Sequence, residues 1–180
     1  MEHRRATVKM PCVLGLCLAF GISAPSAAGP DEAEIKAAFI YNFAKFVEWP
    51  SPAFSRPDAV LNLCISGHDA VESELRQLEG REAQGRRLRL RPVTSQADLE
   101  GCHVLYVAGP ENAPQSSLLQ SLESEAVLTV ADRRDFARQG GVISLFVEGS
   151  RVQFAVNLSA AQSRGLKFSA RLLQLARVPR

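Results

Sequence analysis

The feature that most constrains the fold is the alternation of short apolar runs with stretches of helical periodicity. Units of this kind place their strands side by side and parallel in one sheet, with helices packed on its faces. Strands are expected at 60–65, 86–93, 102–108, 126–131, 142–147 and 151–156, and helices at 31–49, 69–78, 114–123, 133–138, 159–164 and 169–177. The last two strands are joined by Glu148-Gly149-Ser150, which is typical of a hairpin. We therefore expect an α/β fold: a single domain whose mostly parallel sheet of about six strands has helices on both faces and ends in a hairpin and C-terminal helices.

The strand expected at 86–93 has one polar and one apolar face, because its residues alternate between arginine and leucine: Arg87, Leu88, Arg89, Leu90 and Arg91. Charged side chains along one face are typical of a strand at the edge of a sheet, where they discourage pairing with other chains. With this strand at the edge, the first four strands take the order 2-1-3-4, and 60–65 lies beside 102–108. The arginines are interpreted as a solvated face, with a surface for nucleic acid or an acidic partner as the alternative.

The N-terminus has the organisation of a secretory signal peptide. Arg4, Arg5 and Lys9 precede an apolar run at 12–22, and small residues follow up to Ala28. The run is about half the roughly 20 residues that a membrane-spanning helix requires. We expect a signal peptide at 1–28, cleavage near Ala28, and a mature domain at 29–180 in the periplasm. Cleavage removes three basic residues and one acidic residue, which cancels the formal charge of +2 and with it the electrostatic reason to expect nucleic-acid binding.

Two cysteines remain in the mature chain, Cys64 and Cys102. In an oxidising compartment they are expected to form a disulfide, and the strand order above brings them together. The bond is interpreted as a structural cross-link, with a reducible switch as the alternative. Catalytic thiol chemistry is disfavoured because the chain has no Cys-x-x-Cys motif.

The helix expected at 31–49 is rich in aromatic residues: Phe39, Tyr41, Phe43, Phe46 and Trp49. An apolar stripe interrupted by one asparagine is expected to form its packing face: Ile35, Phe39, Asn42, Phe43 and Phe46. The rings are either core residues or, where packing leaves them exposed, a surface for a partner protein or a second copy of the chain.

Residues for catalysis or cofactor binding are scarce. His68 and His103 have no metal-ligand spacing, and Ser66 lacks the Gly-x-Ser-x-Gly motif of a hydrolase. Gly140-Gly141 follows an expected helix, and is therefore interpreted as a helix end and a turn, not a phosphate loop. No catalytic residue, metal or cofactor is expected, although the crevice at the strand ends of such a sheet could hold a small ligand.

Six segments together resemble the YfiR family of periplasmic proteins: AAFIYNFAKFVEWP (37–50), LNLCISG (61–67), GRRLRLRPV (85–93), GCHVLYVAG (101–109), VLTVADRRDFARQGGVISLFVEGSRVQFAVN (127–157) and GLKFSARLLQLA (165–176). The resemblance covers essentially the whole mature chain. It implies a sheet flanked by helices, usually in a homodimer. It also implies that Cys64 and Cys102 match an inter-strand bridge of the family. A second, later bridge has no counterpart, because 142–156 contains no cysteine.

The resemblance further implies a regulatory role. By this resemblance, the protein represses a YfiN-like diguanylate cyclase of the inner membrane by binding the periplasmic part of that enzyme. A YfiB-like outer-membrane lipoprotein would in turn sequester the protein. The prediction is a regulatory binding protein, not an enzyme, that lowers cyclic di-GMP and biofilm formation. The alternative is a periplasmic small-ligand receptor that passes its occupancy to a sensor kinase or cyclase.

Overall fold

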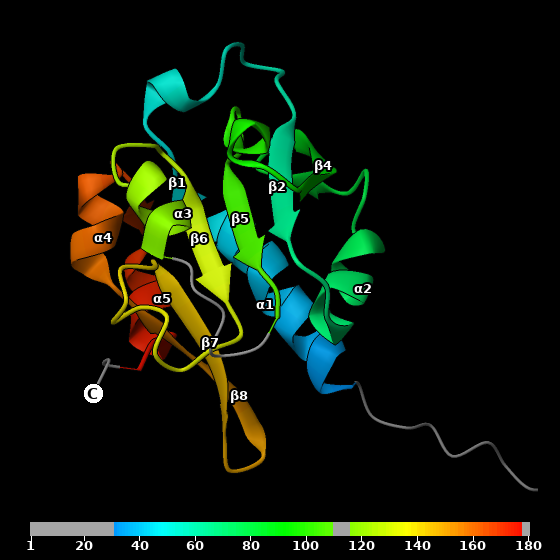
Figure 1. Ribbon diagram of the computed structural model, residues 1–180, viewed down its shortest axis with the longest axis vertical. Coiled ribbons are helices and arrows are strands. Elements are labelled where there is room, and N and C mark those ends of the chain that lie inside the picture. Colours follow the sequence, from blue (N-terminus) through cyan, green and yellow to red (C-terminus); the bar gives the residue numbers. More distant parts are fainter. Residues whose placement is uncertain (1–30, 110–115, 178–180) are drawn as a thin grey trace, which may run out of the picture.

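The computed structural model describes residues 31–109 and 116–177 (Figure 1). The expected signal peptide, its cleavage site and the expected helix start at 114 lie outside these residues. Two sheets are present. The larger has seven strands in the order β3-β4-β2-β5-β6-β7-β8, and the smaller pairs β1 with β9. The strands are β1 (Val47–Glu48), β2 (Leu61–Ser66), β3 (Glu82–Ala83), β4 (Arg86–Val93), β5 (Val104–Val107), β6 (Leu128–Ala131), β7 (Ile143–Glu148), β8 (Arg151–Val156) and β9 (Lys167–Phe168).

The large sheet is mixed. β4, β2, β5, β6 and β7 run parallel, while β3 and β8 join its two edges antiparallel. The expected order of the first four strands is therefore confirmed, and so is the hairpin, which is β7–β8. The two-residue strand β3 was not predicted; it covers part of the β4 edge, pairing Glu82 with Arg87.

The helices lie on both faces of the sheet, as expected, with α1 behind and α3 in front in Figure 1. They are α1 (Glu32–Phe46), α2 (Ala70–Arg76), α3 (Ser116–Ser121), α4 (Leu158–Ser163) and α5 (Ala170–Leu175), with 3₁₀ turns η1 (Ser51–Ala53) and η2 (Gln96–Leu99). Asp69 caps α2, since its Oδ1 accepts a hydrogen bond of 2.8 Å from the Glu72 amide.

Each face of the sheet has its own apolar core. Alternate residues of a strand point to opposite faces, so Leu63 packs under α1 whereas Cys64 packs in the core beneath α3. Ile40 and Phe43 of α1 are fully buried in the first core. Burial of one such side chain stabilises the fold by about 2–3 kcal/mol, so the attachment of α1 to the sheet rests on this contact.

Two helices differ from expectation. α1 ends at Phe46, three residues early, because Val47 and Glu48 pair with Phe168 and Lys167 of β9. The other expected helix, at 133–138, is a series of turns.

The turns at 133–138 have a local cause. The amide of Ala137 donates to the Ser144 hydroxyl at 2.8 Å, so it does not make the backbone hydrogen bond that a helix would require. Gly140 then takes φ +99°, and a Cβ on Gly141 would overlap the Phe136 ring. Gly140-Gly141 is therefore a packed turn, as predicted, but it is not the predicted helix end, because turns and not a helix precede it.

Candidate functional site

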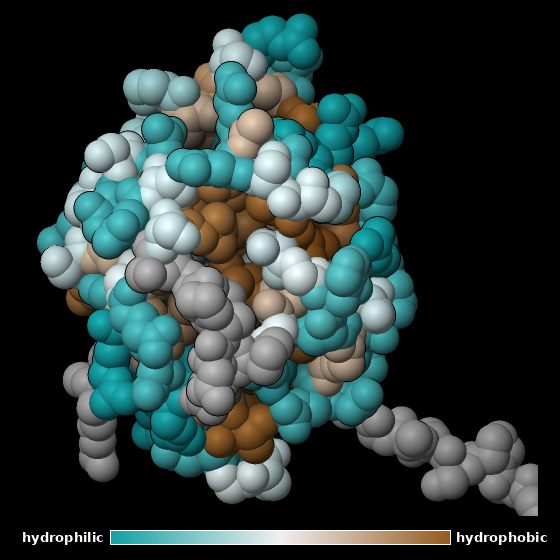
Figure 2. Space-filling model, in the orientation of Figure 1, coloured by the Kyte–Doolittle hydropathy of each residue, from teal (hydrophilic) through white to brown (hydrophobic). Residues whose placement is uncertain are grey.

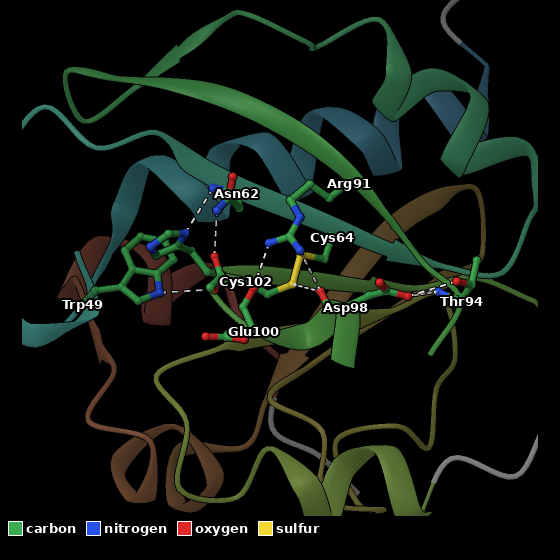
Figure 3. The surroundings of a disulfide bond; sticks show 10 residues. Trp49, Asn62, Cys64, Arg91, Thr94, Asp98, Glu100 and Cys102 are labelled. Carbon is green, nitrogen blue, oxygen red and sulfur yellow. Dashed lines mark hydrogen bonds between the residues drawn. A yellow bond between two sulfur atoms is a disulfide. The ribbon is translucent and has the colours of Figure 1, made fainter. Parts of the chain in front are cut away.

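The two cysteines of the described chain form a disulfide, which confirms the predicted pair (Figure 3). Cys64 lies in the middle of β2 and Cys102 just before β5, with their Cα atoms 5.9 Å apart. Cys64 is fully buried and Cys102 is 6% exposed. The bond joins two neighbouring parallel strands inside the core beneath α3, and it fits an oxidising compartment.

Arg91 holds the segment that leads to the disulfide. Its guanidinium donates to the carbonyl oxygens of Glu100 at 2.8 Å and Asp98 at 3.2 Å. The expectation of three solvated arginines is thus correct for Arg87 and Arg89, which are exposed, and wrong for Arg91, which is half-buried. Arg91 has this role because it is the last of the three along β4, where the chain turns toward η2.

Asp98 organises the turn between β4 and η2. Its Oδ2 accepts hydrogen bonds from the amide and hydroxyl of Thr94, at 2.9 and 3.0 Å, and from those of Ser95, at 2.8 and 3.0 Å. The amides of Thr94 and Ser95, followed by their hydroxyls, lower the pKa of Asp98 to about 2. The carboxylate is therefore ionised at any ordinary pH.

His103 is a structural residue at the start of β5. Its Nδ1 accepts from the Asn62 amide at 3.0 Å, which places the proton on Nε2, where it donates to the Ala53 carbonyl at 3.0 Å. Burial lowers the pKa of His103 below its usual value. Since its neighbour Cys102 is in the disulfide, a cysteine–histidine pair is not formed. The other histidine among the described residues, His68, is exposed.

An aromatic cluster covers His103 at the N-terminal ends of β2 and β5. The Trp49 indole donates to the His103 carbonyl at 3.2 Å. Phe54 stacks on the His103 ring with centroids 4.3 Å apart, and the Arg86 guanidinium lies 3.7 Å from the Phe54 centroid. Trp49, which the sequence places among the candidate surface rings, is thus half-buried in a local cluster.

The other four candidate rings have separate environments. Phe43 is fully buried and belongs to the core. Phe39 is half-buried, with its ring centroid 5.7 Å from that of Phe154. The Tyr41 hydroxyl donates to the Glu82 carbonyl at 2.5 Å, and Phe46 is 45% exposed. Phe39 and Phe46 remain as candidates for a contact surface.

The buried face of α1 is not the one expected from its large apolar residues. It is formed by Ala33, Lys36, Ala37, Ile40, Phe43 and Ala44. Of the expected stripe, only Phe43 is fully buried; Asn42 and Phe46 are exposed. A shallow groove of about 270 Å³ on the outer side of the helix is lined by Ile35, Phe39 and Asn42 of that stripe, together with Glu34 and Ala38. We call the outer stripe of Glu34, Ile35, Ala38, Phe39, Asn42, Lys45 and Phe46 the α1 surface.

Lys36, which the sequence analysis did not single out, is 4% exposed. Its Nζ lies 2.5 Å from Oε1 of Glu32 and 2.6 Å from Oδ2 of Asp132. Burial opposes the charge on Lys36, but hydrogen bonds and attraction from the two carboxylates outweigh it and raise the pKa of the ammonium. Its place four residues before Ile40, on the same helix face, is the signal that could have revealed it.

A crevice of about 440 Å³ opens where β2, β4 and β5 end. Ser66, Val93 and Ala108 mark the three strand ends, and η2 and α3 form its other walls. We call it the strand-end crevice. It adjoins Asp69, whose Oδ2 accepts from the Tyr106 hydroxyl at 2.9 Å and the Gly109 amide at 3.2 Å.

Other site types find no support in the part of the chain that the structure describes. There, no three or more His, Cys, Asp or Glu side chains are grouped as a metal site would require. None of the described helices combines the length and apolar character needed to cross a membrane.

The chain matches a known family model. The model of a family described as YfiR/HmsC-like matches residues 33–177, which includes both cysteines, the α1 surface and the strand-end crevice. No curated protein matches the chain. Since the family model spans well over half of the sequence, the chain belongs to the YfiR/HmsC-like family.

Proposed function

We propose that this protein is a periplasmic regulatory binding protein that represses a membrane-bound signalling enzyme by protein–protein contact. The enzyme is a diguanylate cyclase, so repression lowers cyclic di-GMP and biofilm formation. The observation that carries the proposal is the family match over residues 33–177, because this is a family of regulators and not of known enzymes. The Cys64–Cys102 disulfide supports the periplasmic location.

The state of the reactive side chains favours binding over catalysis. Both cysteines are consumed by their disulfide. Both ring nitrogens of His103 are bonded to backbone groups, which leaves neither to act as a base. These residues hold β2 to the segment that leads into β5, and a protein with such a framework can act by presenting a rigid surface.

The proposed partners are those of the family resemblance. The protein represses its target by binding the periplasmic part of a YfiN-like inner-membrane protein, and a YfiB-like outer-membrane lipoprotein relieves the repression by sequestering it. Its mature form is exported and cleaved near Ala28.

We assign the α1 surface to a second copy of the chain. Glu34 near the start and Lys45 near the end of α1 lie on the same rim of this surface, and both are exposed. Eleven residues of helix separate them by about 16 Å. In an antiparallel pair of α1 helices, each Glu34 would therefore face Lys45 of the partner subunit.

The same arrangement suits the apolar residues. Ala38, near the middle of the helix, allows the two helices to approach closely, while Phe39 and Phe46 bury their exposed parts. The surface is thus complementary to itself in charge and in shape, as a two-fold interface requires.

The function is tested by cross-linking in intact cells, followed by capture of the tagged protein from the envelope. We expect recovery of an inner-membrane protein that carries a diguanylate cyclase domain. A periplasmic protein of unrelated fold with the same tag is the control. Capture that yields no cyclase, from cells in which the tagged chain is abundant in the periplasm, would contradict the proposal.

A small-ligand receptor is the second candidate function, and the strand-end crevice is the observation that favours it. The two functions are compatible, since occupancy of the crevice could be passed to a sensor kinase or cyclase.

A further inference from the structure

The strand-end crevice lies at a topological switch point of the sheet. β2 and β5 are parallel neighbours, but the chain leaves β2 through α2 toward β4 and leaves β5 through α3 toward β6. The two connections therefore diverge and open a space between the carboxyl ends of the strands. In open α/β sheets, this is the place where ligands bind.

The backbone is shaped to keep this space open. Gly67, directly after β2, has φ +87°, a conformation that side chains with a Cβ rarely adopt. A Cβ at this position would lie 2.8 Å from the carbonyl oxygen of Ala108, directly after β5. The two strand ends therefore approach as closely as a glycine permits, and the wall between them is bare backbone.

Three of the five hydroxyl groups in the described lining already donate their protons to oxygens of the protein. Thr94 and Ser95 donate their protons to Oδ2 of Asp98 at 3.0 Å, and Ser121 donates to the Leu118 carbonyl at 2.8 Å. A hydroxyl oxygen that has donated its proton keeps its lone pairs as acceptors. These three hydroxyls can therefore accept hydrogen bonds from a ligand but have no proton left to offer it.

The rest of the lining is apolar or neutral. Val93, Ala108 and Leu118 supply apolar surface, and none of the described residues that line the crevice carries a charge. Figure 2 shows this side of the molecule, where apolar side chains are visible in a central hollow bordered by weakly polar residues. A charged ligand would lose its hydration here without gaining an ion pair.

We propose that the strand-end crevice binds a neutral, hydroxyl-rich molecule about the size of a monosaccharide. The O–H groups of such a ligand donate to the oxygens of Thr94, Ser95 and Ser121, and its C–H face packs on Val93 and Leu118. The volume of about 440 Å³ lies within the range of small-molecule sites. This proposal names the ligand class for the small-ligand receptor proposed above and rests on that function; its failure would leave the proposed protein–protein contacts untouched.

The test is saturation-transfer NMR and calorimetry on the purified protein. The probes are glucose, galactose, mannose, ribose and myo-inositol, with gluconate and glucose 6-phosphate as charged counterparts. Two variants of α3 are compared: Ser117→Trp, which fills the crevice from an exposed position, and Gln120→Trp, which places the same ring at an exposed position outside the lining. A third variant, Ser121→Ala, removes one acceptor.

We expect at least one neutral probe to bind saturably, Ser117→Trp to abolish its binding and Gln120→Trp to leave it intact. Loss of one net hydrogen bond in Ser121→Ala should weaken binding about fivefold. Three results would overturn the proposal: no saturable binding of any neutral probe, equal or tighter binding of the charged counterparts, or binding that Ser117→Trp leaves unchanged. Circular dichroism of each variant establishes that it is folded.

Discussion

The Nζ atom of Lys36 lies 2.6 Å from Oδ2 of Asp132 and joins α1 to the end of β6; the lysine side chain is 5% exposed and the aspartate side chain 30%. Lys36 also contacts the carboxylate of Glu32, which belongs to α1 itself and is mostly exposed. Asp132 is therefore the partner of Lys36 on the sheet side. The ion pair therefore fixes the direction of α1 across the sheet, and with it the residues that face outward on the α1 surface.

The first prediction concerns this pair. Asp132→Asn leaves a buried ammonium with one exposed carboxylate and should lower the free energy of unfolding by about 2 kcal/mol. Lys36→Met keeps the packing and removes the charge, while Asp132 can still be hydrated, so it should cost less than about 1 kcal/mol. Urea denaturation measures both, and the double variant should be no less stable than Lys36→Met. A loss in the double variant equal to the sum of the two single losses would show that the pair is not coupled.

The disulfide gives the second prediction. Cys64 and Cys102 are 38 positions apart, so their bond closes a loop whose entropy in the unfolded chain is worth about 4 kcal/mol. Replacing both with serine should therefore lower the free energy of unfolding by up to this amount. The control is a reductant in the unfolding buffer: it should destabilise the original protein and leave the double variant unchanged. If the original protein unfolds at the same urea concentration with and without reductant, the bond has no stabilising role.

The third prediction is a pH dependence that comes from Asp98. Its pKa is lowered from 3.8 to about 2 in the folded protein, so the unfolded chain binds the proton more readily. The stabilisation is complete above pH 4 and is lost as the pH falls toward 2. In Asp98→Asn this contribution is absent at every pH. The difference in unfolding free energy between the original protein and the variant should therefore shrink over this range, and a difference that stays constant from pH 5 to 2 would refute the assignment.

The fourth prediction tests the α1 surface as a dimer interface. Glu34→Lys or Lys45→Glu alone places like charges opposite each other at two symmetric positions, and each should weaken the dimer about tenfold. The double variant restores opposite charges and should restore the affinity. Sedimentation equilibrium measures the dissociation constant, with Glu125→Lys, an exposed charge reversal between α3 and β6, as the control. Dimers that are equally strong in all four proteins would place the interface elsewhere.

The strands were predictable from the sequence because each carries a regular pattern. Leu88 and the exposed Arg87 and Arg89 mark the two faces of an edge strand, and the continuous apolar run of β5 marks a central one. These two strands set the order of the sheet, which in turn brings Cys64 and Cys102 together. The disulfide was thus predictable from topology as well as from the resemblance to the family.

The face of α1 was not predictable in the same way, because side-chain size misleads when a helix packs closely on a sheet. Ala33, Ala37 and Ala44 form much of the contact, and small residues allow the helix to come near. The larger Phe39 and Phe46 have no room there and turn outward. Periodicity is satisfied by either face, and only the positions of the neighbouring strands decide between them.

Contacts between short segments that are far apart in the sequence were not predictable either. β1 and β9 have two residues each, which is too short for a periodic signal, and Val47 meets Phe168 from the opposite end of the chain. The role of Arg91 likewise depends on where the carbonyl groups of Asp98 and Glu100 lie after the chain turns.

The central claim, repression of a cyclase by contact, is tested most directly by measuring intracellular cyclic di-GMP in cells that lack this gene. We expect the level to rise several-fold on deletion and to return when the chain is restored with residues 1–28, the proposed signal peptide, but not when it is restored without them. An unchanged level on deletion, or full restoration by the form that stays in the cytoplasm, would contradict the claim.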